Sequence, residues 1–309
     1  MSEPVLLLAG PTGVGKSAVA MELAARWGAE IVSADARQLY RGLDIGTAKP
    51  TAEDRQLVPH HLLDLLDPSE RYSAARFLAD AQTALCGIQE RGRRAIVVGG
   101  TGLYLKALRE GLFEAPETSP EVREQVDEMY ARDGKAGLAE YLRQADPATL
   151  AALDVSNPAR LRRAVEYHLM TAESLHAARS ARPGSDSPFT FYPVILSRPR
   201  AELYSRIEDR IARMLSLGWL EEVRTLSDSW DFGLPAFDAV GYRELYDVVL
   251  KRVTFDSAVA EIVRKTRRYA KRQMTWFSHQ GAWIPVSLEN DVTSKISSGL
   301  EVFAENKSA

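Results

Sequence analysis

Cysteine is nearly absent from this chain. Cys86 is the single cysteine among 309 residues. Because a disulfide needs two cysteines and a structural zinc site commonly uses several, the sequence excludes an internal disulfide and a multi-cysteine zinc site. Low cysteine usage is typical of reducing compartments, so we expect a cytoplasmic protein.

Long apolar runs are missing as well. The opening run, Val5–Ala9, is much shorter than the roughly 20 residues that span a bilayer, and it lacks the basic flank of a secretory signal. We therefore expect no targeting segment and no association with a membrane.

An excess of positive charge is also lacking, since 39 Lys and Arg stand against 42 Asp and Glu, a net charge of −3. Any attraction to nucleic acid must therefore come from a local patch. The composition, 45% hydrophobic and 26% charged with five Trp and eleven Tyr, argues against global disorder. The length fits one large or two modest domains.

Four apolar, β-branched runs predict buried strands: Val5–Ala9, Glu30–Ala34, Ala95–Val98 and Phe191–Leu196. Two helical stretches separate the first three: Ala18–Trp27, closed by Gly28, and Ser73–Arg91, closed by Gly92. Alternating strands and helices predict an α/β fold with a parallel sheet covered by helices on both faces.

The strand pattern disappears between Leu112 and about Arg182, where long helical patterns replace it. A loop rich in Pro, Gly and Ser, Arg182–Pro188, precedes the last predicted strand. We therefore expect an α/β core formed by residues 1–111 and 189–309, and an all-helical insertion domain at residues 112–188. Within the core, helices are expected from Arg200 to Phe277, with a turn at Asp231–Pro235.

A glycine-rich segment follows the first strand directly and precedes a helical run. It reads GPTGVGKS and consists of Gly10, Pro11, Thr12, Gly13, Val14, Gly15, Lys16 and Ser17. This is the phosphate-loop motif of ATP-binding and other nucleotide-binding proteins, in the context that the motif requires. Backbone N–H groups, the helix N-terminus and Lys16 would surround a phosphate, and Ser17 would ligate Mg²⁺. A merely tight glycine turn is the alternative.

The phosphate loop alone does not say which phosphates it binds. A nucleoside triphosphatase normally has an acidic residue at the end of a later strand, whereas here Ala95–Val98 runs into Gly99-Gly100-Thr101-Gly102. Asp35, by contrast, follows the second strand, at the sheet edge where ligands of α/β proteins bind. Its carboxylate could ligate Mg²⁺, cap a turn or act as a general base.

Seven further segments have characteristic sequences: Ser33–Pro50 (SADARQLYRGLDIGTAKP), Pro59–Pro68 (PHHLLDLLDP), Tyr72–Phe77 (YSAARF), Gly99–Leu108 (GGTGLYLKAL), Asn157–Glu166 (NPARLRRAVE), Val240–Leu245 (VGYREL) and Ala270–Phe277 (AKRQMTWF). In order and spacing they resemble the bacterial tRNA dimethylallyltransferases, also called tRNA isopentenyltransferases. The resemblance extends from about residue 5 to residue 280.

The resemblance implies a phosphate-loop NTPase-like or kinase-like core with a helical insertion that contacts tRNA. It also implies transfer of the dimethylallyl group from dimethylallyl diphosphate to the exocyclic amino group of the adenosine 3′ of the anticodon, in tRNAs that read codons beginning with U. Mg²⁺ is the expected cofactor, and the tRNA anticodon stem-loop and dimethylallyl diphosphate are the expected partners of a monomer.

The same resemblance assigns roles to single residues. Asp35 matches the general base, and Arg210 joins the phosphate loop in holding the diphosphate. Thr101, in the loop that ends the third strand, is placed to hold the base or Asp35, and an ordinary turn threonine is the alternative. The positions expected to contact tRNA are Asp35, Ala36, Arg37, Gln38, Thr101, Arg123, Ala159, Arg160, Leu161, Arg162, Arg163, Gly241, Tyr242, Arg243, Lys271, Arg272, Gln273 and Trp276. One departure concerns Ala36-Arg37-Gln38, where the family usually has Ser-Met-Gln, so Arg37 could add a contact that relatives lack.

Two predicted helices carry the positive charge that tRNA binding requires. Six of the nine residues from Arg264 to Arg272 are basic, and Tyr269 and Trp276 beside them offer stacking surfaces. A second cluster, Arg160–Arg163, follows Asn157-Pro158, which predicts a helix start. A solvated face is the alternative for the first cluster. The pair His60-His61 has no nearby ligand set, and we interpret it as structural.

An adenine stacked in the anticodon loop must flip out to enter a closed site, so we expect a channel that the donor and the base enter from opposite sides. Three alternatives remain: an adenylate isopentenyltransferase acting on free nucleotides, a phosphate-loop small-molecule or nucleotide kinase, and an RNA-binding protein with an inactive phosphate loop. The basic helices argue against the first, the missing strand-end acid against the second, and Asp35 beside Lys16-Ser17 against the third.

Overall fold

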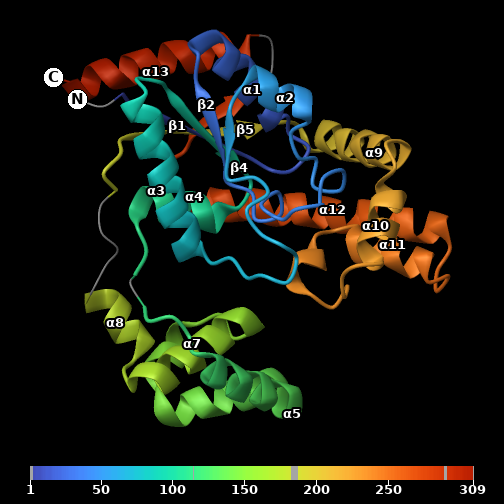
Figure 1. The fold of residues 1–309 in the computed structure, drawn as a ribbon. Helices are drawn as coiled ribbons and strands as arrows, with labels where there is room; N and C mark the ends of the chain where they lie inside the picture. Colours follow the sequence, from blue (N-terminus) through green and yellow to red (C-terminus); the bar gives the residue numbers. More distant parts are fainter. Residues whose placement is uncertain (1–2, 114, 182–186, 289–290, 309) are drawn as a thin grey trace. The chain divides into compact units, whose positions relative to one another are not determined.

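The computed structural model describes residues 3–113, 115–181, 187–288 and 291–308. The chain forms two compact units: unit 1 is Met1–Arg109 with Ser187–Ala309, and unit 2 is Glu110–Asp186, where the sequence led us to expect 112–188. Figure 1 shows the sheet and its helices in unit 1, and the helices α5, α7 and α8 in unit 2. No helix among the described residues is long and apolar enough to cross a membrane.

A six-stranded parallel sheet forms the centre of unit 1, in the order β3-β2-β4-β1-β5-β6 (Figure 1). The strands are β1 (Val5–Ala9), β2 (Glu30–Ser33), β3 (His60–His61), β4 (Ala95–Gly99), β5 (Phe191–Ser197) and β6 (Ile284–Ser287). The strand β1 is buried along its whole length, with Leu7 opposite Val97 of β4 and Pro193 of β5. The predicted α/β class is confirmed.

The four strands expected from the sequence are present, each within one residue of its expected limits. The strands β3 and β6 were not predicted. β3 has only two residues, and β6 contains Pro285 and is mostly exposed, so neither presents a buried, β-branched run.

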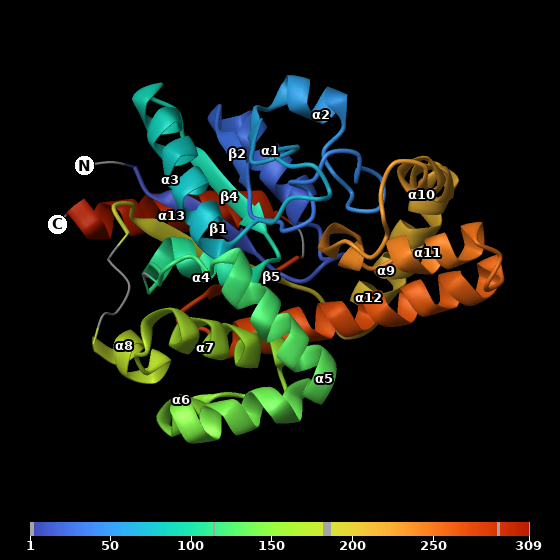
Figure 2. The same cartoon turned by 60° about the horizontal axis from the view of Figure 1, so that its bottom comes forward.

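Helices cover both faces of the sheet. The helices α1 (Lys16–Trp27) and α13 (Val292–Ser308) pack on each other and on one face, and α3 (Ala74–Glu90) lies on the opposite face (Figures 1 and 2). The stripe that α3 buries recurs at helical spacing: Phe77, Ala81, Leu85 and Ile88. As expected, α1 ends at Gly28, whose φ of 64° closes the helix.

A group of helices follows β5 and packs beside the sheet. They are α9 (Arg200–Ser216), α10 (Trp219–Ser227), the short 3₁₀ helix η1 (Pro235–Asp238), α11 (Tyr242–Val249) and α12 (Phe255–Ser278). Neighbouring members of the group contact one another, and α12 also contacts α9. The predicted turn at Asp231–Pro235 lies between α10 and η1. The remaining helices of the core are α2 (Ala52–Leu57) and α4 (Gly102–Glu110).

Unit 2 contains α5 (Pro120–Ala145), α6 (Pro147–Ala152), α7 (Pro158–Thr171) and α8 (Leu175–Ala181), and none of its described residues forms a strand. Its hydrophobic core consists of Val126, Leu138, Leu142, Leu161, Ala164, Val165, Tyr167, Leu175 and Ala178. The helix α7 begins as predicted, because Asn157 Oδ1 accepts hydrogen bonds from the N–H groups of Ala159 and Arg160. Of the predicted loop Arg182–Pro188, residues 182–186 lie outside the described residues.

Glu30 joins the edge of the sheet to the end of α3. Its side chain is buried at the start of β2 and accepts hydrogen bonds from His61 Nε2 at 2.7 Å and from Arg91 Nη2 at 2.6 Å. The hydrogen bond from Arg91 is the main reason that the pKa of Glu30 lies below its ordinary value. Burial opposes this shift, and the hydrogen bond from His61 adds to it. His61 therefore has a structural contact in β3.

Replacing Glu30 by Gln is expected to lower the free energy of unfolding by about 1.5–3 kcal/mol, the usual contribution of hydrogen bonds to a charged group. Because the folded-state pKa of Glu30 is depressed, this stabilisation is present above the unfolded-state pKa and is lost as the pH falls through the folded-state value. Urea unfolding at neutral and at acidic pH measures both effects.

The control is Glu3→Gln, which removes a carboxylate that lies 2.8 Å from Arg94 but is 61% exposed. An exposed pair contributes less than about 1 kcal/mol, so this variant should unfold close to wild type. Equal losses in the two variants at neutral pH would contradict the role of Glu30.

Candidate active site

The phosphate loop connects the end of β1 to the first turn of α1. Gly13 and Gly15 have φ values of 81° and 113°, which residues with a side chain rarely adopt. They allow the backbone to curl before Lys16 begins the helix. The loop therefore presents N–H groups and the positive end of α1 to the space in front of it.

Lys16 is partly buried inside this loop. Its Nζ donates to the carbonyl oxygens of Gly10 and Pro11, each at 2.9 Å. The pKa of Lys16 is lowered to about 8, mainly by burial and also by Arg210, while Asp35 opposes the shift. A bound phosphate would place a negative charge beside this ammonium group and so stabilise its protonated form.

The helix α9 brings arginines to the same place. Burial lowers the pKa of Arg210, an effect that Asp35 opposes and Arg213 reinforces. Arg206 Nε donates to the carbonyl oxygen of Gly13 at 3.1 Å, so α9 is bonded directly to the phosphate loop. Sequence reasoning identified Arg210 but missed Arg206 and Arg213, because arginines are ordinary residues on an exposed helix.

A cavity of about 770 Å³ opens in front of the phosphate loop. Nine charged side chains line it: Lys16, Lys49, Arg55, Arg206, Arg210 and Arg213, with Asp44, Asp64 and Asp209. The excess of positive charge suits a ligand such as a diphosphate. Sequence reasoning also failed to predict Lys49 and Arg55 at this site, because only the fold brings these two residues to the cavity in front of the phosphate loop.

Ser17 is the one predicted metal ligand, and its exposed side chain lines the same cavity. Among the described residues, no group of three or more His, Cys, Asp or Glu could hold a metal ion. Mg²⁺ usually keeps several waters and takes phosphate oxygens of a substrate as ligands. A single hydroxyl group therefore fits an ion that is held mainly by a bound diphosphate.

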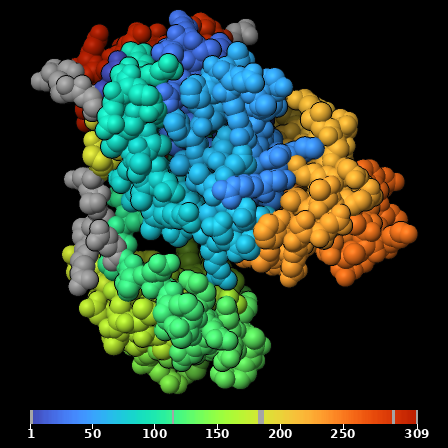
Figure 3. Space-filling view, in the orientation of Figure 1, coloured from blue at the N-terminus to red at the C-terminus, as the bar shows by residue number. Residues whose placement is uncertain are grey.

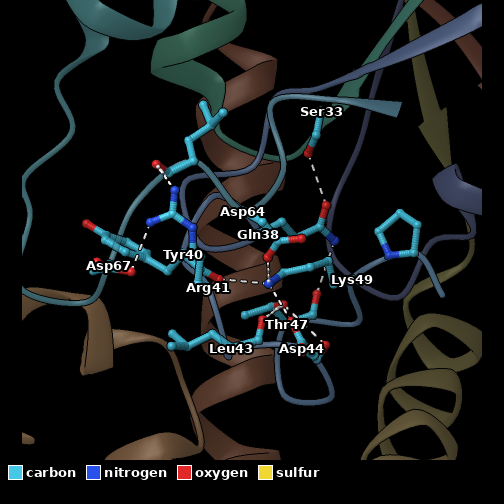
Figure 4. A network of polar contacts seen from close by, with 12 residues as sticks. Ser33, Gln38, Tyr40, Arg41, Leu43, Asp44, Thr47, Lys49, Asp64 and Asp67 are labelled. Atoms are coloured by element: carbon cyan, nitrogen blue, oxygen red, sulfur yellow. Dashed lines mark hydrogen bonds and ion pairs between the residues drawn. The ribbon is translucent and has the colours of Figure 1, made fainter. Parts of the chain in front are cut away.

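The segment of residues 34–50 leads from β2 to the cavity and is held by Lys49 (Figure 4). The side chain of Lys49 is only 1% exposed. Its Nζ donates to Tyr40 O at 2.7 Å, Asp44 Oδ1 at 2.5 Å and Asp64 Oδ1 at 2.6 Å. A buried cation with three oxygen partners fixes the course of this segment.

Gln38 also bonds within this segment (Figure 4). Its Oε1 accepts from Ser33 Oγ at 3.0 Å, and its Nε2 donates to the carbonyl oxygens of Thr47 and Ala48 at 3.2 and 3.1 Å. The sequence led us to expect that Gln38 contacts tRNA. In the structure its amide group already has partners inside the protein.

Glu222 of α10 holds the same segment from the other side. Its carboxylate accepts hydrogen bonds from the N–H groups of Asp44, Ile45 and Gly46 at 2.6–3.2 Å and from Tyr242 Oη at 2.8 Å. The segment of residues 34–50 and the helices after β5 meet on the surface of unit 1, where Figure 3 shows the blue and the orange residues in contact. Sequence reasoning missed Glu222, since a glutamate in an amphipathic helix looks like a solvated residue.

Asp35 lies just beyond β2, at the same edge of the sheet as the phosphate loop. Its Oδ1 accepts from the N–H of Arg37 at 2.8 Å. Its charge raises the pKa of both Lys16 and Arg210, two of the cations that line the cavity. The structure thus brings together the predicted base and the predicted diphosphate site.

Thr101 supports the backbone next to Asp35. Its Oγ1 accepts from the N–H of Ala36 at 3.1 Å, and its own N–H donates to the carbonyl oxygen of Ala34 at 3.3 Å. Thr101 was expected to hold the base or Asp35. In the structure it holds the backbone on both sides of Asp35.

Two tyrosines lie near Asp35. Burial is the main cause that raises the pKa of Tyr104 and of Tyr269, the latter to about 12, and the charge of Asp35 adds to both shifts. Tyr104 stacks on Phe77 with 4.3 Å between the ring centroids. Both phenols stay protonated at neutral pH. Tyr104 is buried in the core, whereas the partly exposed Tyr269 can stack on a base or donate a hydrogen bond. Sequence reasoning missed Tyr104.

Four residues that were expected to contact tRNA are buried: Leu161, Gly241, Tyr242 and Gln273. Leu161 belongs to the core of unit 2, and a Cβ at Gly241 would lie 2.0 Å from the ring of Trp219. Gln273 is 6% exposed and bonds the N–H of Thr12, so that N–H is not free for a phosphate. The structure corrects the expectation, because these side chains support the surface and do not form it.

Arg37 and Arg243 bind the stretch of residues 233–238. Arg37 Nη1 donates to Pro235 O at 2.7 Å. Arg243 Nη2 donates to Gly233 O at 3.2 Å and lies 2.8 Å from Asp238 Oδ1. Each arginine therefore has a structural role in this part of the surface, to which any contact with RNA would be additional.

The basic run on α12 divides into two groups. Three cations form ion pairs with Glu261, Glu244 and Glu208: Arg264, Lys265 and Arg267. Three others are exposed and have no ion pair within the described part of the chain: Arg268, Lys271 and Arg272. Only the second group is available to RNA phosphates without losing a carboxylate partner.

The expected tRNA residues of unit 2 lie on α5 and α7. Ala159 and Arg160 are exposed at the start of α7. Arg162 pairs with Asp127, Arg163 Nη1 donates to Thr118 Oγ1 at 2.7 Å, and Arg123 Nη2 donates to Thr118 O at 3.3 Å. The start of α7 is therefore the part of this unit that best presents positive charge.

The sequence profile of the IPP transferase family matches residues 38–280, and that of isopentenyl transferase matches residues 3–64. The chain is 45% identical over 277 residues to tRNA dimethylallyltransferase 1 of Citrifermentans bemidjiense, with 89% of each protein covered. It is 41% identical over 304 residues to the tRNA dimethylallyltransferase of Halorhodospira halophila, covering 96% of this chain and 97% of that protein.

Solved structures show the same similarity. The tRNA isopentenylpyrophosphate transferase of Bacillus halodurans matches with a TM-score of 0.71 at 34% identity, covering 99% of this chain and 100% of that one. A eukaryotic dimethylallyltransferase acting on tRNA matches in fold, with a TM-score of 0.83 at 23% identity over 99% of this chain and 80% of that one. The profile match and the identity to relatives over most of their length show that the chain belongs to the IPP transferase family.

Proposed function

We propose that the protein is a tRNA dimethylallyltransferase. It transfers the dimethylallyl group of dimethylallyl diphosphate to the exocyclic amino group of the adenosine 3′ of the anticodon, in tRNAs that read codons beginning with U. The observation that carries the proposal is that Asp35 and the phosphate loop follow parallel strands at the same edge of the sheet, with the charge of Asp35 acting on Lys16 and Arg210. Transfer from a diphosphate to an amine needs a proton acceptor next to an anion site.

In this proposal the phosphate loop, Gly10–Ser17, and Arg210 hold the diphosphate of the donor. Arg206 and Arg213 lie on the same face of α9 as Arg210 and add positive charge to the cavity. Mg²⁺ held by Ser17 and by diphosphate oxygens would neutralise further charge on the leaving group. The number of cations around the loop supports an anion of high charge.

The reaction breaks the bond between the allylic carbon and a diphosphate oxygen, and forms a bond from that carbon to N6 of adenine. The electrons of the broken bond leave with the diphosphate, where backbone N–H groups, Lys16 and Arg210 stabilise the charge. N6 loses a proton as its lone pair forms the new bond, and Asp35 accepts that proton. A positioned general base contributes roughly 10²–10⁴-fold to the rate.

The adenine must leave the stack of the anticodon loop to reach Asp35. Tyr269 offers an aromatic surface to the flipped base, and the unpaired cations of α12 offer contacts to RNA phosphates. Arg160 at the start of α7 offers a further contact from unit 2. In this proposal the enzyme acts as a cytoplasmic monomer on the anticodon stem-loop.

Incubation with labelled dimethylallyl diphosphate, Mg²⁺ and an unmodified anticodon stem-loop tests the proposal. Label is expected in the adenosine 3′ of the anticodon, and no label in free adenylate incubated in parallel. Label in adenylate alone would indicate an adenylate isopentenyltransferase. Consumption of ATP with no transfer of the allyl group would indicate a kinase.

Lys16→Ala is expected to weaken donor binding and turnover while tRNA affinity stays nearly intact, because the ammonium group faces the diphosphate. The pKa of about 8 adds a pH dependence, since only protonated Lys16 pairs with the anion. Donor affinity of the wild type should fall as the pH rises through this value, and the variant should lack the step. Calorimetric titration across pH measures it, and an equal loss of tRNA affinity would show that the loop serves the RNA or the fold.

Asp35→Asn keeps the shape of the side chain but cannot accept a proton. Both substrates should still bind, while the single-turnover rate at saturating tRNA and donor falls by roughly 10²–10⁴-fold. If Asp35 is instead a ligand of Mg²⁺, the defect should appear in donor affinity and recover with excess Mg²⁺. A rate within a few-fold of wild type would exclude Asp35 as the base.

Replacing Lys271 and Arg272 by Ala is expected to weaken tRNA binding and to flatten its salt dependence. Each lost phosphate contact removes roughly 0.7–0.9 from the slope of log affinity against log salt. The matched control replaces Arg264 and Lys265, which lie on the same helix but are paired with glutamates. Its slope should stay near that of wild type, whereas the same change in both double variants would indicate a general effect of charge.

A further inference from the structure

Gln273 joins α12 to the two loops that frame the candidate site. Its side chain is buried, with Oε1 accepting from the N–H of Thr12 at 2.8 Å and Nε2 donating to the carbonyl oxygen of Gly100 at 2.9 Å. Thr12 belongs to the phosphate loop, and Gly100 precedes Thr101, which holds the backbone around Asp35. One amide group therefore links the donor side and the acceptor side to the same helix.

Two glycines allow α12 to approach this closely. A Cβ at Gly100 would lie 2.3 Å from Nε2 of Gln273, and a Cβ at Gly102 would lie 2.3 Å from the ring of Trp276. Gln273 and Trp276 are three residues apart and share one face of α12. The side chains of Gln273 and Trp276 thus rest directly on the backbone of Gly100 and Gly102.

The exposed face of the same helical turn carries positive charge. Lys271 and Arg272 directly precede Gln273 and have no ion pair among the residues that the structure describes. The same turn therefore offers its outer face to an anionic ligand and its inner face to the phosphate loop.

We propose that Gln273 is a positioning residue that couples RNA binding on α12 to diphosphate binding by the phosphate loop. The identity of the two ligands rests on the proposed function. RNA phosphates that hold Lys271 and Arg272 fix the turn that carries Gln273, and its amide group then fixes Thr12. A loop that is already ordered binds its anion more tightly, because less ordering remains for the binding step.

Thermodynamic linkage makes the coupling reciprocal. If bound RNA raises the affinity for diphosphate by some factor, bound diphosphate raises the affinity for RNA by the same factor. A purely structural role of Gln273 has a different signature. It would change stability, or both separate affinities, without changing the factor that relates them.

The test measures diphosphate affinity by calorimetry with and without RNA. Inorganic diphosphate with Mg²⁺ probes the donor site, and an unmodified anticodon stem-loop probes the acceptor site. Saturating stem-loop should tighten diphosphate binding to the wild type, within the range of about 5–150-fold that is typical of coupled sites. Gln273→Met has a similar shape without the two hydrogen bonds, so it should lose the coupling, and its diphosphate affinity should be the same with and without the stem-loop.

Two further variants make the test specific. Gln280→Met removes another amide near the end of α12, which accepts from Lys106 Nζ at 2.9 Å and does not contact the phosphate loop, so it should keep the full coupling. Gln273→Glu keeps an acceptor for Thr12 but places a carboxylate against the carbonyl oxygen of Gly100, so its coupling should fall. The thermal melting of each variant reports whether it folds, and Gln273→Glu serves if the methionine variant does not.

The proposal is overturned if the stem-loop leaves diphosphate affinity of the wild type unchanged, or if both Gln273 variants keep the wild-type coupling. It is also overturned if Gln280→Met loses the coupling to the same extent. Transfer of the dimethylallyl group without coupling would contradict only this inference. Cooperative binding of both probes without any transfer would contradict only the proposed function.

Discussion

The buried ammonium group of Lys49 is the contact on which the acceptor side of the site depends. The segment of residues 34–50 contains turns and one isolated β-bridge, from Tyr40 to Leu66, but no helix or strand. Burial removes the water around the ammonium group of Lys49, and oxygens of Tyr40, Asp44 and Asp64 take its place. The Nζ atom therefore joins three points of the chain. Asp35 lies at the start of this segment, where Thr101 holds the backbone on both sides of it.

The helices after β5 serve both halves of the site. Arg206 and Arg210 of α9 approach the phosphate loop, Glu222 of α10 binds the backbone of residues 44–46, and α12 contacts both loops through Gln273. The sheet places the phosphate loop and the loop of residues 99–102 at one edge, and these helices bind both of these loops or the segment next to them. Donor and acceptor are therefore positioned by one packed scaffold within unit 1.

Local signals explain what the sequence could predict. The four long strands, the phosphate loop and Asp35 were recognisable because buried β-branched runs and glycine spacing act over a few residues. Lys49 and Glu222 were not, because a buried charge is recognised only by partners that the fold brings to it. The basic run on α12 was found, yet its division into paired and free cations depends on Glu208 and Glu244, which lie on other helices. Gln273 directly follows that run and was assigned to the RNA surface, although its side chain is buried.

The two outer strands of the sheet bear on how the protein behaves at high concentration. An open sheet exposes unpaired N–H and C=O groups at its edges, which can recruit a strand of another molecule. Here one edge is β3, with two residues, and the other is β6, where Pro285 lacks an N–H group. Neither edge offers the long, regular template that intermolecular strand pairing needs. The short length of β3 and the proline of β6 kept both strands from being predicted, and the same two features protect the folded protein against edge-to-edge aggregation.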